Sequence, residues 1–199
     1  FDSWAAPFIM ASINTRVVLR SNALMDGYYA ENFQYDEAML TGPDRKGRKI
    51  AKKISFGTKA SMVAMSLTPL RWLAARLFLT KPGDGPSPEQ QLKGFYDLRL
   101  LGRTSRGERI RVKVTGDRDP GYGSTAKMLA QAGISLRRDV DASEVGGGFW
   151  TPATAFNDKL ISRLSEHAGM TFELQSISPA MTAIEDSTVV SVSDPVQAD

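Results

Sequence analysis

Two arginines on a predicted helix are the first side chains that could bind a charged ligand. The apolar residues between Pro7 and Met25 recur with the spacing of an α-helix. At about 100° per residue, Arg20 lies in the middle of the apolar stripe and Arg16 lies at its edge. The guanidinium of Arg20 is therefore expected to reach water along its stem, to pair with a buried carboxylate, or to bind a ligand carboxylate or phosphate. Because an unpaired buried charge is costly, Arg20 must have a partner or water.

A tyrosine in a glycine-rich turn is the second candidate. Tyr122 lies between Gly121 and Gly123 in the sequence DPGYG, just before a predicted helix. Its hydroxyl could reach a ligand and donate a proton if its pKa were shifted, whereas the simpler role of the ring is packing. The backbone N–H groups of this turn, and of the GGG turn at 146–148, could bind an anion, although turn geometry alone explains both groups of glycines. Neither turn has the spacing of a nucleotide-binding loop.

The composition excludes several kinds of site. The 199 residues include no cysteine and one histidine, which rules out disulfides, thiolate metal sites and multi-histidine metal sites, so no metal is expected. His167 falls in the last turn of a predicted helix, where capping of the helix end is favoured over a catalytic role. With 25 basic and 22 acidic residues, the net charge of +3 does not favour a nucleic-acid partner.

Two segments of the first half raise the question of solvent or membrane contact. The stretch from Thr41 to Lys53 is rich in turn residues and strongly basic, and it is predicted to be a solvated loop. Residues 60–79 are apolar on nearly all sides, but two arginines and Pro69 argue against a membrane-spanning helix. This second segment predicts a kinked, largely buried helix; the alternative is an interfacial helix or the wall of a lipid-sized cavity.

The middle of the chain predicts a β-hairpin followed by a helix. Residues 95–102 and 109–116 alternate apolar and polar side chains and are joined by the turn RTSRGE. Ser124 is expected to be the N-cap of a helix that continues to about Arg137.

The last part predicts one more helix and short strands. Thr151 is expected to cap a helix that has Pro152 at its first position and closes at Gly169. A short strand follows at 170–174, and residues 188–192 could add an edge strand. Helices and a strand pair without regular βαβ alternation indicate an α+β fold, an antiparallel sheet packed with helices.

Five stretches occur in a recognisable order: WAAPFIMASINTRVVLRSNAL, FQYDEAM, PGDGPSPEQQ, DPGYGSTAKMLAQAG and GGGFWTPATAFNDKLISRL. Together they resemble the saccharopine dehydrogenase-like oxidoreductases, a family that includes the trans-acting enoyl reductases of mycobacterial lipid synthesis. The resemblance covers about residues 4–174.

The resemblance implies that residues 1–175 are the C-terminal, substrate-binding domain of a Rossmann-type dehydrogenase. Members of the family bind NADP(H) or NAD(H) in an N-terminal Rossmann domain, whose G-x-G-x-x-G segment is missing from these 199 residues. The chain begins FDSWAAPF without an initiator methionine, which is consistent with a fragment whose partner is that missing domain.

The resemblance also implies roles for the polar residues. By this resemblance Tyr122 is expected to donate a proton. The residues expected to contact the cofactor or substrate are Asn14, Arg16, Arg20, Gly121 and Gly123. The hydride chemistry belongs to the cofactor, and the protein positions the substrate and stabilises developing negative charge.

The parent protein is thus expected to be a NAD(P)H-dependent oxidoreductase that acts on a lipid or acyl substrate, while this chain alone is expected to be inactive. It is expected in the cytoplasm or at a membrane surface that residues 60–79 contact. The alternative is a noncatalytic module that binds lipid or a membrane surface through the same apolar segment. Residues 176–199 form an extension that the resemblance does not cover, and a homodimer through the sheet is compatible with the fold.

Overall fold

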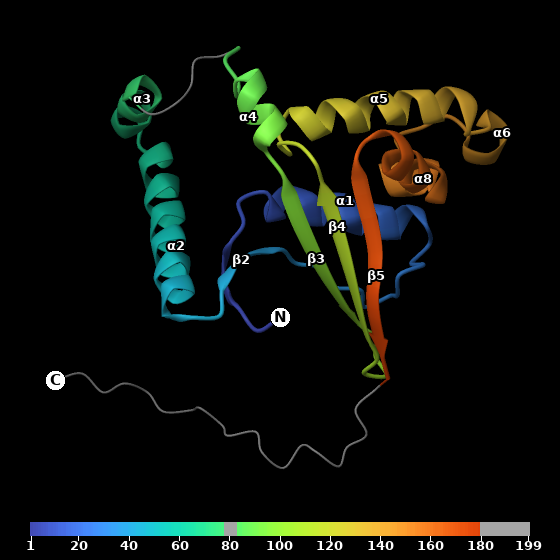
Figure 1. Ribbon diagram of the computed structural model, residues 1–199, viewed down its shortest axis with the longest axis horizontal. Helices are drawn as coiled ribbons and strands as arrows, with labels where there is room; N and C mark the ends of the chain where they lie inside the picture. The colour runs from blue at the N-terminus through green and yellow to red at the C-terminus, as the bar shows by residue number, and fades with distance from the viewer. Residues whose placement is uncertain (78–82, 180–199) are drawn as a thin grey trace. The chain divides into compact units, whose positions relative to one another are not determined.

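The computed structural model describes residues 1–77 and 83–179, which fall into two compact units (Figure 1). Of the described residues, 1–77, 83–87 and Ala132–Leu160 form unit 1, and Pro88–Gln131 and 161–179 form unit 2. Each unit combines helices with antiparallel strands. The α+β class predicted from the sequence is therefore confirmed.

Unit 1 begins with a strand at a place where a helix is predicted. β1 (Trp4–Pro7) pairs antiparallel with β2 (Ala38–Gly42), and α1 (Ala11–Leu24) starts only after β1. The predicted helix start at Pro7 is wrong because the backbone of β1 bonds to a strand that is distant in the sequence, which local apolar spacing cannot reveal. From Ala11 to Leu24 the predicted helix is confirmed.

The basic stretch predicted to be a loop is the start of a long helix, α2 (Arg45–Ser66). Asp44 caps this helix, because its carboxylate accepts a hydrogen bond of 2.7 Å from the backbone N–H of Gly47. Gly47 and Ala51 are buried, and α2 contacts both β1 and β2. The loop prediction is wrong because packing of this small-residue face outweighs repulsion among the cations on the other face.

The apolar segment that follows is kinked, as predicted, but it is exposed. α2 ends at Ser66, Leu67 has an extended backbone, and α3 (Thr68–Leu77) begins directly afterwards. Met62 and Trp72 are 62% and 64% exposed, so the predicted burial of this segment is wrong for the residues that the structure describes. Positions 78 and 79 of the predicted helix lie outside those residues. Over 1–77 and 83–179, no helix is long and apolar enough to cross a membrane.

Unit 2 is built on a three-stranded antiparallel sheet. After the short helix α4 (Pro88–Lys93), β3 (Tyr96–Arg103) and β4 (Arg109–Gly116) form the predicted hairpin. β5 (Met170–Ser178) pairs with the other edge of β4, which gives the order β3-β4-β5 (Figure 1). The boundary predicted at residue 175 falls within β5. The predicted strand at 188–192 lies outside the described residues.

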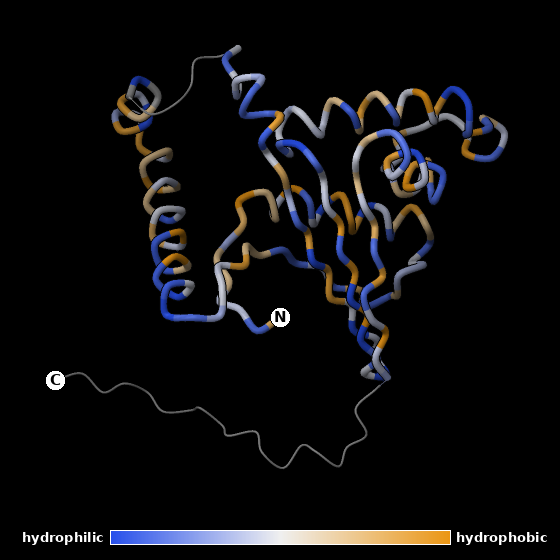
Figure 2. The backbone as a smooth tube through the Cα atoms, viewed as in Figure 1, coloured by the Kyte–Doolittle hydropathy of each residue, from blue (hydrophilic) through white to orange (hydrophobic). Residues whose placement is uncertain are grey.

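The two faces of this sheet differ in polarity, as the alternation in the sequence predicts. Figure 2 shows hydrophobic and hydrophilic residues alternating along the strands. The register places Leu98, Val114 and Phe172 side by side on one face. The next row, on the opposite face, consists of Arg99, Lys113 and Glu173. The apolar face is half-buried along β4, whereas Leu98 on β3 is 53% exposed.

The remaining helices lie between β4 and β5 in the sequence. They are α5 (Gly123–Arg138), α6 (Ala142–Val145), α7 (Pro152–Phe156) and α8 (Asp158–His167). Thr151 is the N-cap of α7 and Pro152 its first residue, as predicted. The single helix predicted from there to Gly169 is instead divided at Asn157, whose φ of 50° is incompatible with an α-helix. His167 does end α8, and Gly169, at φ 67°, follows as the predicted terminator.

Candidate functional site

An open hollow of about 310 Å³ in unit 1 brings together residues of α1 and of the loop before α7. Arg16 and Arg20 lie four residues apart on α1, so they project from one face of the helix. Residues that follow the GGG turn complete the hollow. The lining is formed by Arg16, Val17, Arg20, Phe149, Trp150 and Thr151.

Buried hydroxyl groups attach this loop to α1. The Oγ1 of Thr151 lies 2.7 Å from the Oγ of Ser21, and both residues are buried. The Ser21 hydroxyl also donates to the carbonyl oxygen of Val17, at 3.0 Å. The backbone N–H of Thr151 in turn donates to Oγ1 of Thr154 at 3.0 Å. The entry to α7 is therefore fixed against the helix that carries the arginines.

The arginines of the hollow have no carboxylate partner in the described part of the chain. Arg20 is exposed, and its Nη2 donates a long hydrogen bond of 3.5 Å to the carbonyl oxygen of Phe149. Arg16 is also exposed. Of the three roles expected for Arg20, pairing with a buried carboxylate is therefore not what the structure shows, and its guanidinium reaches water.

The chemistry of the hollow suits a ligand with both an anionic and an apolar part. Two guanidinium groups provide several N–H donors for a carboxylate or phosphate. Phe149 is 93% exposed and Trp150 is 40% exposed, so two aromatic rings are accessible beside these charges. Aromatic rings bind flat or aliphatic groups and also stack against guanidinium planes.

Asn14, predicted to contact a ligand, is bonded within the protein. Its Nδ2 donates to Oε2 of Glu37 at 2.8 Å, and the hydroxyl of Tyr35 donates to Oε1 of the same carboxylate at 2.7 Å. Burial, together with the bond to Glu37, raises the pKa of Tyr35 to about 12. Sequence reasoning missed Tyr35 and Glu37 because nothing in their local pattern shows that they meet α1.

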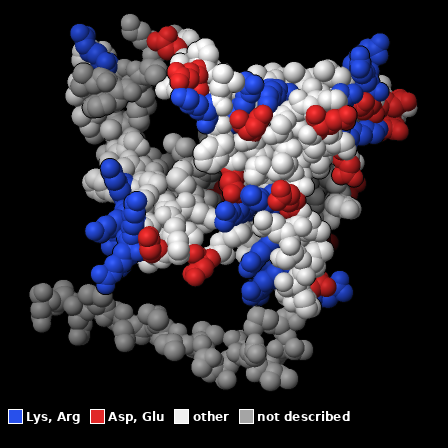
Figure 3. Space-filling view, in the orientation of Figure 1, with Lys and Arg blue, Asp and Glu red and all other residues white. Residues whose placement is uncertain are grey.

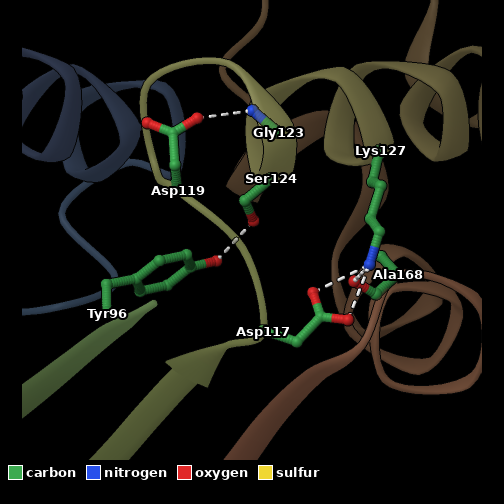
Figure 4. A network of polar contacts seen from close by, with 7 residues as sticks. All are labelled: Tyr96, Asp117, Asp119, Gly123, Ser124, Lys127 and Ala168. Carbon is green, nitrogen blue, oxygen red and sulfur yellow. Dashed lines mark hydrogen bonds and ion pairs between the residues drawn. The ribbon is translucent and has the colours of Figure 1, made fainter. Parts of the chain in front are cut away.

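The predicted Tyr122 turn lies in unit 2 and is closed by Asp119. The carboxylate of Asp119 accepts hydrogen bonds from the backbone N–H groups of Gly121, Tyr122 and Gly123, at 3.0, 3.0 and 2.8 Å. Figure 4 shows the bond from Gly123. The bond from Gly123, followed by those from Tyr122 and Gly121, lowers the pKa of Asp119. These N–H groups are thus already engaged, and the expectation that the turn offers them to an anion is wrong for this structure.

The start of α5 also differs from the predicted cap at Ser124. The helix begins one residue earlier, at Gly123, and Asp119 satisfies the free N–H groups before it. Ser124 is fully buried, and its hydroxyl lies 2.9 Å from the hydroxyl of Tyr96 on β3 (Figure 4). Ser124 therefore connects α5 to the sheet.

An ion pair holds the first turns of α5 from the other side. Nζ of Lys127 lies 2.7 and 2.8 Å from the two carboxylate oxygens of Asp117, and it donates to the carbonyl oxygen of Ala168 at 3.0 Å (Figure 4). These contacts join the end of β4, α5 and the end of α8. Because its N–H donors are engaged in these contacts, we assign Lys127 a structural role.

Tyr122 itself points to no internal partner among the described residues. Its side chain is 55% exposed, and no hydrogen bond of its hydroxyl is found there. Tyr122 lies in unit 2, whereas Asn14, Arg16 and Arg20 lie in unit 1, so their meeting in one active site stays a prediction.

The described residues offer no metal site and only part of what a dinucleotide needs. Among them, no three His, Cys, Asp or Glu side chains gather to hold a metal ion. The carboxylate of Asp119 occupies the backbone N–H groups of the glycine turn before α5, so a pyrophosphate does not fit there. The arginine-lined hollow can hold an anionic group, but it lacks the glycine-rich turn at a helix start with which a dinucleotide fold holds a pyrophosphate.

The chain combines an α+β fold with a hollow in unit 1 that is lined by cations and aromatic rings. Comparison with known proteins gives its relatives. It is 36% identical over 164 residues to proteins named trans-acting enoyl reductase from Mycobacterium tuberculosis and Mycobacterium bovis, which covers 81% of this chain and 39% of each relative. A trans-acting enoyl reductase from Mycobacterium ulcerans is 33% identical over 172 residues, covering 82% of this chain and 39% of the relative.

The chain is therefore a homologue of proteins of the enoyl reductase type over about four fifths of its length. It spans about two fifths of the length of the curated relatives that it matches. No protein-family profile matches the chain. No solved structure matches it either.

Proposed function

We propose that this chain is the substrate-binding part of a NAD(P)H-dependent reductase that acts on an enoyl thioester or a related acyl lipid. The observation that carries the proposal is the homology to proteins named trans-acting enoyl reductase over 81% of the chain. The nicotinamide, when bound, supplies a hydride. The residues of this chain bind the acyl substrate, orient it and supply a proton.

The hollow of unit 1 provides the groups that such a substrate requires. Arg16 and Arg20 bind the anionic or carbonyl end through their N–H donors, and Phe149 and Trp150 contact the acyl part. Negative charge develops on the carbonyl oxygen of a conjugated thioester when its double bond accepts a hydride, and a fixed guanidinium stabilises that charge. The exposed hydroxyl of Tyr122 is the proton donor in this proposal.

The cofactor belongs, in this proposal, to a further domain of the Rossmann type. These 199 residues contain no G-x-G-x-x-G segment, and the relatives are more than twice as long as the matched region. The resemblance of five stretches to saccharopine dehydrogenase-like enzymes supports NADP(H) or NAD(H) as the cofactor and supports the assignment of this chain to the C-terminal, substrate-binding part.

The test uses the protein expressed from its full reading frame, with a long-chain trans-2-enoyl-CoA as the probe and NADPH and NADH as alternative reductants. Arg16→Gln/Arg20→Gln is expected to weaken probe binding about 10- to 100-fold, the effect of losing hydrogen bonds to a charged group. Tyr122→Phe is expected to lower kcat about 100-fold or more while binding is retained. Circular dichroism verifies that each variant is folded.

Arg109→Gln/Arg111→Gln on β4 is the matched control, because it removes the same charge from exposed positions outside the hollow. Equal weakening in this control and in the α1 variant would assign the effect to net charge and contradict the site. Absence of reduction by either nucleotide, together with tight binding of the probe, would support the noncatalytic lipid-binding module instead.

A further inference from the structure

One face of α2, on the side away from β1 and β2, carries both basic and apolar side chains along the length of the helix. Seven residues lie within about 100° of arc when the helix is projected at 100° per residue. We call this set the outer stripe; it consists of Arg45, Arg48, Lys49, Lys52, Phe56, Lys59 and Val63. All seven are exposed. The stripe follows the helix for five turns and presents a continuous surface.

The cations of the outer stripe are not neutralised within the protein. In the part of the chain that the structure describes, none of its five Lys and Arg residues lies within ion-pair distance of a carboxylate. The guanidinium of Arg48 lies 5.3 Å from the centre of the Trp4 ring. The four cations nearest the start of the helix surround a shallow hollow of about 300 Å³, and Figure 3 shows basic side chains gathered over these turns.

The inner face of the first turns of α2 packs on the β1–β2 pair, so the outer stripe cannot turn towards these strands. Gly47 and Ala51 are buried, and α2 contacts both strands. A side chain at position 47 would collide with the backbone of Thr41 and Gly42. The packing of unit 1 therefore holds the stripe towards solvent.

Exposed apolar side chains lie within the outer stripe and also on α3. Phe56 is 75% exposed and Val63 is 61% exposed, in line with the cations. Trp72 on α3 is 64% exposed, and the guanidinium of Arg76 lies 5.6 Å from the centre of its ring. Large apolar side chains interleaved with unpaired cations are the composition of helices that lie in a membrane interface.

We propose that α2 and α3 dock on an anionic phospholipid surface, with the outer stripe and Trp72 facing the headgroups. The cations complement the negative surface potential, while Phe56, Val63 and Trp72 enter the boundary between headgroups and acyl chains. A nucleic acid would use the cations but offers no apolar layer for Val63. This docking is independent of the reductase proposal, because none of its residues lines the hollow at α1.

The proposal is tested by flotation of the purified 199-residue chain with vesicles of phosphatidylcholine, with and without phosphatidylglycerol. Binding is expected only with phosphatidylglycerol and is expected to fall as salt rises, since ions screen charge over about 10 Å at 0.1 M. Arg45→Gln/Arg48→Gln/Lys49→Gln/Lys52→Gln is expected to weaken binding about 100-fold or more, at roughly fivefold for each cation. Phe56→Gln/Val63→Gln is expected to weaken the binding that remains at high salt.

Two matched controls separate this surface from general charge and general hydrophobicity. Arg103→Gln/Arg106→Gln/Arg109→Gln/Arg111→Gln removes four exposed cations of the hairpin, and Leu129→Gln removes an exposed apolar side chain of α5. Both are expected to bind vesicles like the unmodified chain. Equal losses in the controls, no binding to anionic vesicles, or binding to a single-stranded oligonucleotide but not to vesicles would each overturn the proposal.

Discussion

Asp119 shows how a single carboxylate organises the turn that carries Tyr122. It accepts three consecutive backbone N–H groups, which are the donors that a helix start leaves without intrahelical partners. An ionised carboxylate accepts these bonds better than a protonated one does, so the bond from Gly123, followed by the others, lowers its pKa. The ionised form of Asp119 therefore contributes to the stability of the turn.

Replacing Asp119 with Asn should destabilise the protein in a pH-dependent way. Since the folded pKa of Asp119 is lowered, its contribution is complete above the ordinary Asp pKa of about 3.9 and is lost as the pH falls through the folded value. We expect Asp119→Asn to melt about 2–4 °C below the unmodified chain near neutral pH, as for a lost helix cap in a chain of this size. This difference should shrink as the pH falls below the ordinary Asp pKa.

Thermal unfolding followed by circular dichroism at several pH values measures this difference. Asp36→Asn is a suitable control, because Asp36 bonds only to the N–H of its neighbour Glu37 in the described structure. A gap between Asp119→Asn and the unmodified chain that stays constant down to the lowest pH would show that the charge of Asp119 does not stabilise the turn.

At the scale of elements, the sequence predicts those whose signal is local. The hairpin of β3 and β4 is such a case, since alternation and a short turn lie in one continuous segment. The start of α2 is the opposite case. Its cations suggest a loop, and only the pairing of β1 with β2 provides the surface on which Gly47 and Ala51 pack. Because that surface comes from distant residues, neither the helix nor its exposed outer face follows from the local pattern.

The candidate site divides in the same way. Arg16 and Arg20 could be predicted because they interrupt an apolar stripe within one helix. Phe149 and Trp150, which face them across the hollow, could not, since a contact between buried hydroxyls of Ser21 and Thr151 brings that loop to α1. The closure of the Tyr122 turn by Asp119 can be predicted from the sequence, because an Asp before a helix start is a common cap.

Two glycines of α2 provide a test of how this helix is positioned. At Gly47 an added methyl group would collide with the backbone of Thr41 and Gly42 in β2. Gly47→Ala should therefore separate α2 from the strands and destabilise unit 1 by about 1–3 kcal/mol. At Gly57 an added methyl group meets nothing within 4 Å. Gly57→Ala should therefore stabilise the helix by up to about 1 kcal/mol, the difference in helix propensity.

Urea unfolding followed by tryptophan fluorescence measures both variants, because Trp4, Trp72 and Trp150 all lie in unit 1. Opposite shifts of the two midpoints are the expected result. Similar destabilisation by both substitutions would mean that α2 tolerates no alanine for reasons other than contact with β2, and would contradict the packing described here.

At the scale of the whole molecule, the described residues supply a candidate binding site, and the glycine turn before α5 is not free to hold a pyrophosphate in the way a dinucleotide fold does. The hollow of unit 1 has cations and aromatic rings, and the glycine turn of unit 2 is filled by Asp119. The relatives named trans-acting enoyl reductase are matched over 39% of their length. The function proposed above therefore requires a nicotinamide site that residues outside these 199 supply.

That requirement predicts the size of the native protein. If the proposed cofactor domain belongs to the same polypeptide, intact-mass measurement of the protein from its source should give more than twice the 21.7 kDa of this chain, and N-terminal sequencing should show a glycine-rich βαβ segment before Phe1. The full polypeptide should then bind NADPH or NADH, because a Rossmann domain holds the pyrophosphate at a helix N-terminus.

A native mass of 21.7 kDa would contradict the single-chain arrangement. The cofactor domain would then have to be a separate subunit that co-purifies with this chain, and failure to find one would leave lipid binding as the function that the site supports.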